Sequence, residues 1–236
     1  MTCAGQAARL QSSADGRNVS LPGLYEVFLN PGRLFEKMRE TPRVLIPYVV
    51  VIVIVLVYAM SVSGVMLRMQ LEAMQERGAQ LPPGFDAHAL RMSGIGVMLL
   101  VSVVTPLAAA GLAMFFGGLV MAGHASFRQL LSVMVYGEIV YMFGQLVHLP
   151  MILLKKTMMV SLSPAALVPH AEPSSLLWAG LSKLGLFNIW ELIVIGIGLS
   201  VVFGFSRNKG YILAVLSMGL LSILQVITTL IGSTFG

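Results

Sequence analysis

Charged side chains are scarce in this sequence. Only 11% of its 236 residues are Asp, Glu, Lys or Arg, whereas 57% are hydrophobic, and the mean hydropathy is +0.87. Soluble globular domains carry about 25% charged residues, with which they cover their surface. The scarcity of charge therefore excludes a water-soluble fold and predicts an all-α polytopic membrane protein whose exterior mostly faces lipid.

Cysteine is nearly absent as well. Cys3 is the single cysteine, which excludes an intramolecular disulfide and a thiolate metal cluster. The sequence also lacks a Gly-rich phosphate loop, a serine nucleophile elbow and an HExxH metal helix. We therefore predict no catalytic residue, no metal site and no cofactor.

Long apolar runs are what the sequence has in abundance. Each is long enough, at about 1.5 Å per residue, to cross a hydrocarbon core about 30 Å thick. They predict five transmembrane helices, over residues 44–66, 94–121, 129–154, 186–205 and 211–231.

The domain organisation follows from the same pattern. Residues 1–23 are polar and show no apolar periodicity, so we expect a disordered cytoplasmic tail. Residues 24–231 form the predicted membrane domain.

A short amphipathic helix is expected before the first span. Asn30 and Pro31 form a typical N-cap followed by proline at the first helical position. Leu34, Phe35 and Met38 then share one face, and charged residues occupy the other. This pattern predicts an interfacial helix that lies flat in the headgroup layer and ends near Thr41-Pro42.

The basic residues lie at the ends of the apolar runs instead of in an aromatic-rich stripe, which argues against nucleic-acid binding despite the net charge of +5. On the five-span layout, nine of the 15 Lys and Arg residues fall on the side of the N-terminus. The positive-inside rule therefore predicts a cytoplasmic N-terminus, and five spans then place the C-terminus outside. The nine are Arg9, Arg17, Arg33, Lys37, Arg39, Arg43, Arg128, Arg207 and Lys209.

One polar stripe runs along the third span. At helical spacing, Glu138, Tyr141, Gln145 and His148 lie close to one side of the helix. A carboxyl group inside an apolar helix is costly unless it is neutral, paired or in contact with water. The stripe is either a path for protons or solutes or a hydrogen-bond ladder between helices, and we favour the ladder.

Asn188 and Glu191 form a second candidate site near the start of the fourth span. Because Trp190 precedes Glu191 and Trp is favoured at the membrane interface, we expect Glu191 to be an interfacial anchor. Glu191 is also the one acid that could face Glu138 from another span.

Small residues recur every four positions in two spans, which allows close helix approach. The hypothesis is that the two stripes contact each other. They are Ala109, Ala113 and Gly117 in the second span, and Gly196, Ser200 and Gly204 in the fourth.

Four short motifs recur in a fixed order along the chain: Leu29-Asn30-Pro31 with Phe35, 125–131 (ASFRQLL) with Tyr136, Phe187-Asn188-Ile189-Trp190, and Ser206-Arg207-Asn208-Lys209. In this order and layout the sequence resembles the Yip family of Ypt/Rab-interacting membrane proteins, in particular its bacterial members. The resemblance implies five spans, a cytoplasmic N-terminus and a place in the bacterial inner membrane, and it implies no catalytic residue. The Asp-Leu-Tyr-Gly-Pro motif of eukaryotic members, which are linked to Rab-type GTPases, is absent here, which argues against GTPase binding.

Two functions from different classes fit these features. The first is a non-enzymatic, membrane-organising scaffold that acts on the lipid bilayer and on a membrane-protein partner or a second copy of itself. The alternative is a small-solute or ion transporter or channel that uses the stripe beginning at Glu138.

Overall fold

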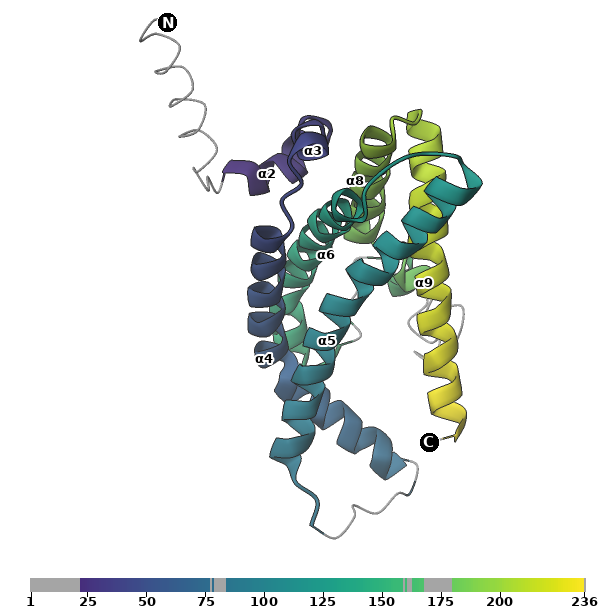
Figure 1. Ribbon diagram of the computed structural model, residues 1–236. Helices are drawn as coiled ribbons and strands as arrows, with labels where there is room; N and C mark the ends of the chain where they lie inside the picture. The colour runs from purple at the N-terminus through teal and green to yellow at the C-terminus, as the bar shows by residue number, and fades with distance from the viewer. Residues whose placement is uncertain are drawn as a thin grey trace, which may run out of the picture.

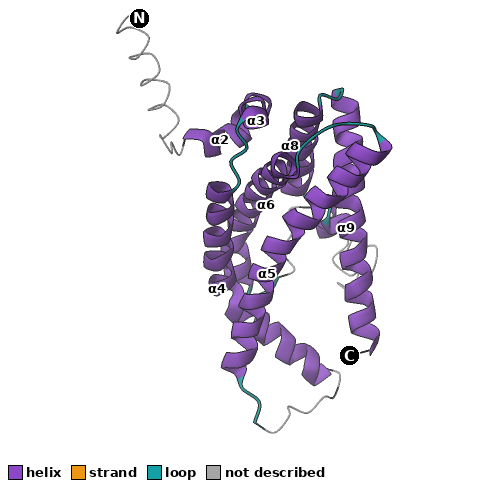
Figure 2. Ribbon diagram, in the orientation of Figure 1, coloured by secondary structure: helices purple, strands orange, loops and turns teal. Residues whose placement is uncertain are grey.

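The computed structural model describes residues 22–76, 78, 84–158, 160, 163–167 and 180–235. All regular structure in these residues is helical (Figure 2), which confirms the all-α class. The predicted tail lies outside the described residues, except for residues 22 and 23 at the start of the first described helix.

Four described helices are long and apolar enough to cross a membrane. They are α4 (Leu45–Glu76), α5 (Ala87–Met114) with its π-helical continuation η1 (Phe115–Val120), α6 (Phe127–Lys155) and α8 (Leu186–Phe203). They correspond to the first four predicted spans. The last helix, α9 (Arg207–Phe235), includes the fifth predicted segment, whose role as a span stays a prediction.

Two helices extend further than the apolar runs indicated. α4 continues to Glu76 and carries an ion pair between Arg68 and Glu72, with 3.1 Å between Nε and Oε1. α5 begins at Ala87 because Asp86 caps it, its Oδ1 accepting the His88 backbone N–H at 2.8 Å. Hydropathy marks only the part of a helix that lies in hydrocarbon, so these polar ends were missed.

The central helix of the bundle is α6. In its most apolar stretch 72% of the residues are buried, compared with 33% in α4 and 22% in α5. It packs against α4, α5 and α8, and α9 packs extensively on α8 (Figure 1). A capping box starts α6: Ser126 Oγ accepts the Gln129 N–H, and Gln129 Oε1 accepts the Ser126 N–H at 2.8 Å.

Two short helices cover one end of this bundle, α2 (Pro22–Leu29) and α3 (Pro31–Glu40) (Figure 1). Asn30 caps α3 as predicted, with its Oδ1 accepting the Arg33 N–H at 3.3 Å, and Thr41 is the C-cap. Lys37 joins the two helices through an ion pair to Glu26, with Nζ 2.9 Å from Oε1.

The apolar face of α3 is part of the protein core. Leu34, Phe35 and Met38 are buried in the same cluster as side chains of α6 and α8. The apolar face therefore packs on protein, and the place of α3 in the headgroup layer stays a prediction, because amphipathicity alone does not distinguish a lipid surface from a protein surface. Two further bonds attach the segment to α6: Gln129 Nε2 donates to the Arg39 carbonyl at 2.6 Å, and Ser132 Oγ donates to the Arg43 carbonyl at 3.1 Å.

Gly196 and Ser200 of α8 pack against α9 instead of the stripe of α5, which corrects the hypothesis that the two stripes contact each other. A Cβ on Gly210 would collide with the backbone carbonyl of Gly196 and would stand 2.6 Å from the Ser200 Cβ. Gly117 of the other stripe lies in η1, where a Cβ would meet the Phe203 ring of α8 and a Leu213 methyl group of α9. The α8–α9 seam is therefore closed by glycine on both helices.

This seam yields a stability prediction. Gly210→Ala should lower the free energy of unfolding by about 1–3 kcal/mol, because the added methyl group meets backbone atoms that do not yield. Thermal unfolding of the purified protein in detergent measures the change.

The matched control is Gly111→Ala in α5, where an added Cβ has no heavy atom within 4 Å. It should leave the free energy of unfolding unchanged or raise it by up to about 1 kcal/mol through helix propensity. Equal effects of the two substitutions would contradict the seam as described.

Candidate functional site

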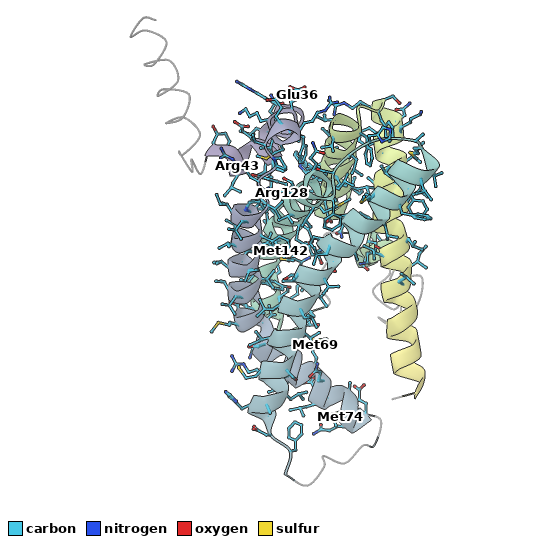
Figure 3. The ribbon with its side chains drawn as sticks, in the orientation of Figure 1. Glu36, Arg43, Met69, Met74, Arg128 and Met142 are labelled. Atoms are coloured by element: carbon cyan, nitrogen blue, oxygen red, sulfur yellow. The ribbon has the colours of Figure 1, made fainter. Side chains whose placement is uncertain are left out.

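A pocket of about 460 Å³ opens between α5 and α9, and residues of α6 and α8 also line it. α5 and α9 approach each other near η1 and diverge toward the other end of the bundle (Figure 1). Met142, which lines the pocket, lies about halfway along the bundle (Figure 3). Eight polar side chains from several elements reach the pocket: Ser102, Thr105, Glu138, Tyr141, Lys183, Asn188, Glu191 and Ser222.

The two predicted sites are brought together here. Glu138 and Tyr141 come from α6, and Asn188 and Glu191 come from α8. Glycines on α6 permit this meeting: a Cβ at Gly137 would stand 2.5 Å from the Ile195 Cγ1 and 3.7 Å from the Glu191 Cγ. α8 thus lies close to α6, and Glu191 packs beside the residue that precedes Glu138.

The two carboxyl groups share the same unusual environment. Glu138 and Glu191 are each only 8% exposed. Neither Glu138 nor Glu191 forms a hydrogen bond or an ion pair with another described residue. Every side-chain oxygen of the described residues that is completely shielded from solvent does have a hydrogen-bonding partner. The carboxyl oxygens must therefore be open to the pocket. Water, a proton or a positively charged ligand would satisfy them there.

The burial of Glu191 differs from the water-exposed side chain that an interfacial anchor would have. Glu191 is buried in the pocket, whereas its neighbour Trp190 is 44% exposed. Adjacent residues point about 100° apart around a helix, so the aromatic anchor and the carboxyl group face different surroundings. The interfacial preference of Trp190 therefore says little about Glu191.

The other half of the α6 stripe contacts neighbouring helices. Tyr58 Oη of α4 donates to Gln145 Oε1 at 3.2 Å. His148 Nδ1 donates to the Gly144 carbonyl of its own helix at 2.7 Å, and the His148 ring meets Phe187 of α8 edge-on. These contacts are what a packing role for Gln145 and His148 requires.

Four polar pocket residues were missed from the sequence: Ser102, Thr105, Lys183 and Ser222. Ser102 and Thr105 carry a signal, because hydroxyl groups three residues apart share a helix face. No group of three or more potential metal ligands occurs within the described part of the chain.

Seven basic side chains gather at one end of the bundle, here called the basic end: Arg33, Lys37, Arg39, Arg43, Arg128, Arg207 and Lys209. All are exposed. These residues come from separate segments that lie close together. Arg207 Nη2 is 3.5 Å from the position that a Cβ on Gly32 would take, and Arg39 Nη2 is 3.9 Å from the corresponding position on Gly204. Arg43, Arg128 and the neighbouring acid Glu36 are at this end in Figure 3.

Comparison with known proteins supports the family resemblance. Residues 25–229 match the Yip1 domain. Over 222 residues the chain is 23% identical to the membrane protein YknW of Bacillus subtilis (strain 168), an alignment that covers 94% of this chain and 96% of that protein. No solved structure matches the chain. Because the domain covers most of its length, this chain belongs to the Yip1 domain family of multi-pass membrane proteins.

Proposed function

We propose that this protein is a non-catalytic, membrane-organising scaffold of the bacterial inner membrane, and that its basic end gathers anionic lipid headgroups on the cytoplasmic side. The observation that carries the proposal is the docking of α3 through its buried apolar face. Leu34 and Phe35 hold the helix on the bundle, so the charged face of α3 is turned outward at a fixed position.

Charge and position favour anionic lipid as the target. The basic end lies where α4, α6 and α9 begin, which is headgroup depth if these helices span the membrane. A Lys or Arg near an anionic membrane surface contributes about 1 kcal/mol of attraction. Three acids, Glu26, Glu36 and Glu40, lie in the same segment and offset part of this attraction; Glu26 is already paired with Lys37. The seven basic side chains of the basic end outnumber them.

The proposed topology has five spans, with α9 as the last and α2 and α3 at the cytoplasmic surface. It is supported by the excess of basic residues at the basic end, because translocation of positive charge is disfavoured. Partners such as a second copy or another membrane protein would then meet the exposed apolar faces of α4 and α5.

The lipid proposal predicts a difference between the two ends of the bundle. We expect the triple variant Arg33→Gln, Arg207→Gln, Lys209→Gln to lose most of the local enrichment of phosphatidylglycerol. Energy transfer from the labelled protein to a fluorescent phosphatidylglycerol in mixed vesicles measures that enrichment. Wild-type enrichment should also weaken on going from 0.05 M to 0.5 M salt, since screening shortens the range of the attraction.

The matched control removes three charges from the other end: Arg68→Gln, Lys155→Gln, Lys156→Gln. It should leave phosphatidylglycerol enrichment within the error of the wild-type value. Equal losses in the two triple variants would overturn the role of the basic end.

The topology predicts opposite compartments for the two chain ends. Cys3 is the natural reporter for the N-terminus, because it is the only cysteine. In intact cells a membrane-impermeant maleimide should leave Cys3 unlabelled until the membrane is opened. The variant Cys3→Ser, Ser233→Cys should be labelled at once. Labelling of both positions under the same condition would require an even number of spans.

Transport is the second candidate function, and the pocket with its two carboxyl groups is the observation that favours it. A transport path would have to continue from the pocket toward Gln145 and His148. These two side chains are instead engaged in contacts with Tyr58, Gly144 and Phe187. We therefore expect proteoliposomes to show no ion or proton flux above that of empty vesicles under an imposed gradient. Flux that is lost in Glu138→Gln would establish the transporter instead.

A further inference from the structure

We propose that the pocket between α5 and α9 binds an amphipathic organic cation, with its positive group held between Glu138 and Glu191 and its apolar part against α5 and α9. This inference concerns the interior of the bundle and does not depend on the role of the basic end.

The acidic side chains define the charge of the ligand. Glu138 and Glu191 come from different helices, are more than nine-tenths buried and line the same pocket. Neither has a hydrogen-bonding partner among the described residues. Lys183 is the one basic side chain among the described lining residues; it is exposed, and its positive charge acts on Glu191 from the edge of the pocket. A cationic group would satisfy both carboxyl groups through charge-assisted hydrogen bonds or direct ion pairing.

The walls define the rest of the ligand. Val97 and Val101 of α5 and Val215 and Met218 of α9 line the pocket. The first three are about half exposed, which makes the mouth apolar on a surface that faces hydrocarbon in a membrane-spanning bundle. A ligand that enters there needs an apolar body, so a small hydrated ion fits poorly.

The size of the pocket agrees with a small organic molecule. Its volume of about 460 Å³ lies within the range of about 300–1,000 Å³ that is common for small-molecule sites. The combination of apolar walls with a few convergent polar groups is also typical of such sites. Two sources carry this chemistry: the amine headgroup of phosphatidylethanolamine, and soluble amphipathic amines.

The test uses the full chain in nanodiscs of phosphatidylcholine and phosphatidylglycerol, titrated with radiolabelled tetraphenylphosphonium. We expect saturable binding above that of empty discs. Glu138→Gln and Glu191→Gln should each weaken it about tenfold, because each loses one interaction with a charged group, and the double variant should lose saturable binding. Neutral triphenylphosphine oxide should not compete.

Two further variants separate ligand binding from folding. Gly219→Trp should weaken binding with both carboxyl groups intact, because Gly219 lines the pocket and a Cβ there has open space around it. Glu72→Gln, at an exposed ion pair on α4, should bind as the wild type does. Thermal unfolding of every variant in discs verifies that the fold is retained.

A second set of discs identifies the source. If inclusion of phosphatidylethanolamine reduces tetraphenylphosphonium binding competitively, the lipid amine occupies the pocket. If it has no effect, the site serves soluble amines. Absence of saturable binding to the wild type, or unchanged binding in both the double variant and Gly219→Trp, would overturn the proposal.

Discussion

The close approach of α8 to its neighbours is the constraint on which the rest of the structure depends. Apolar side chains gain little by leaving lipid for protein, so helices in a membrane associate through tight packing, for which small residues are needed. Gly137 and Gly144 of α6 admit Ile195 and Phe187, and Gly196 admits the start of α9. A fourth contact involves Gly198, where a Cβ would meet Val133 of α6 and Phe35 of α3.

The close approach of α8 to α6 also places two carboxyl groups in the interior of the bundle. By lying close to α6, α8 carries Glu191 into the interior beside Glu138. Burying two carboxyl groups that have no hydrogen-bonding partner among the described residues is costly in a membrane. Hydrogen bonds such as that from Tyr58 to Gln145 already tie the helices together. The cost of this burial is the reason to propose a ligand for the acidic pair.

The sequence predicts where the helices lie along the chain, but it does not predict which helices contact each other. Hydropathy locates the first four spans, and Asn30-Pro31 locates the start of α3, because both signals are local. The packing of Phe35 against α6 and α8 and of Gly196 against α9 depends on residues that are distant in the sequence. No local pattern specifies such contacts. The pocket could be predicted only in part: Glu138 was evident as an acid in an apolar run, but the burial of Glu191 follows from helix rotation and from Gly137, which no local pattern specifies.

α8 also connects the pocket with the basic end. Its first half carries Asn188 and Glu191 into the pocket, and its second half presents Gly198 to Phe35 under α3. Protein interiors are packed too densely for such contacts to deform independently. A Cβ on Gly198 would stand 3.0 Å from the Phe35 ring, so α8 and α3 are in close contact there. The outward-facing charges of α3 and the acidic interior are thus connected through one helix, α8, which contacts both.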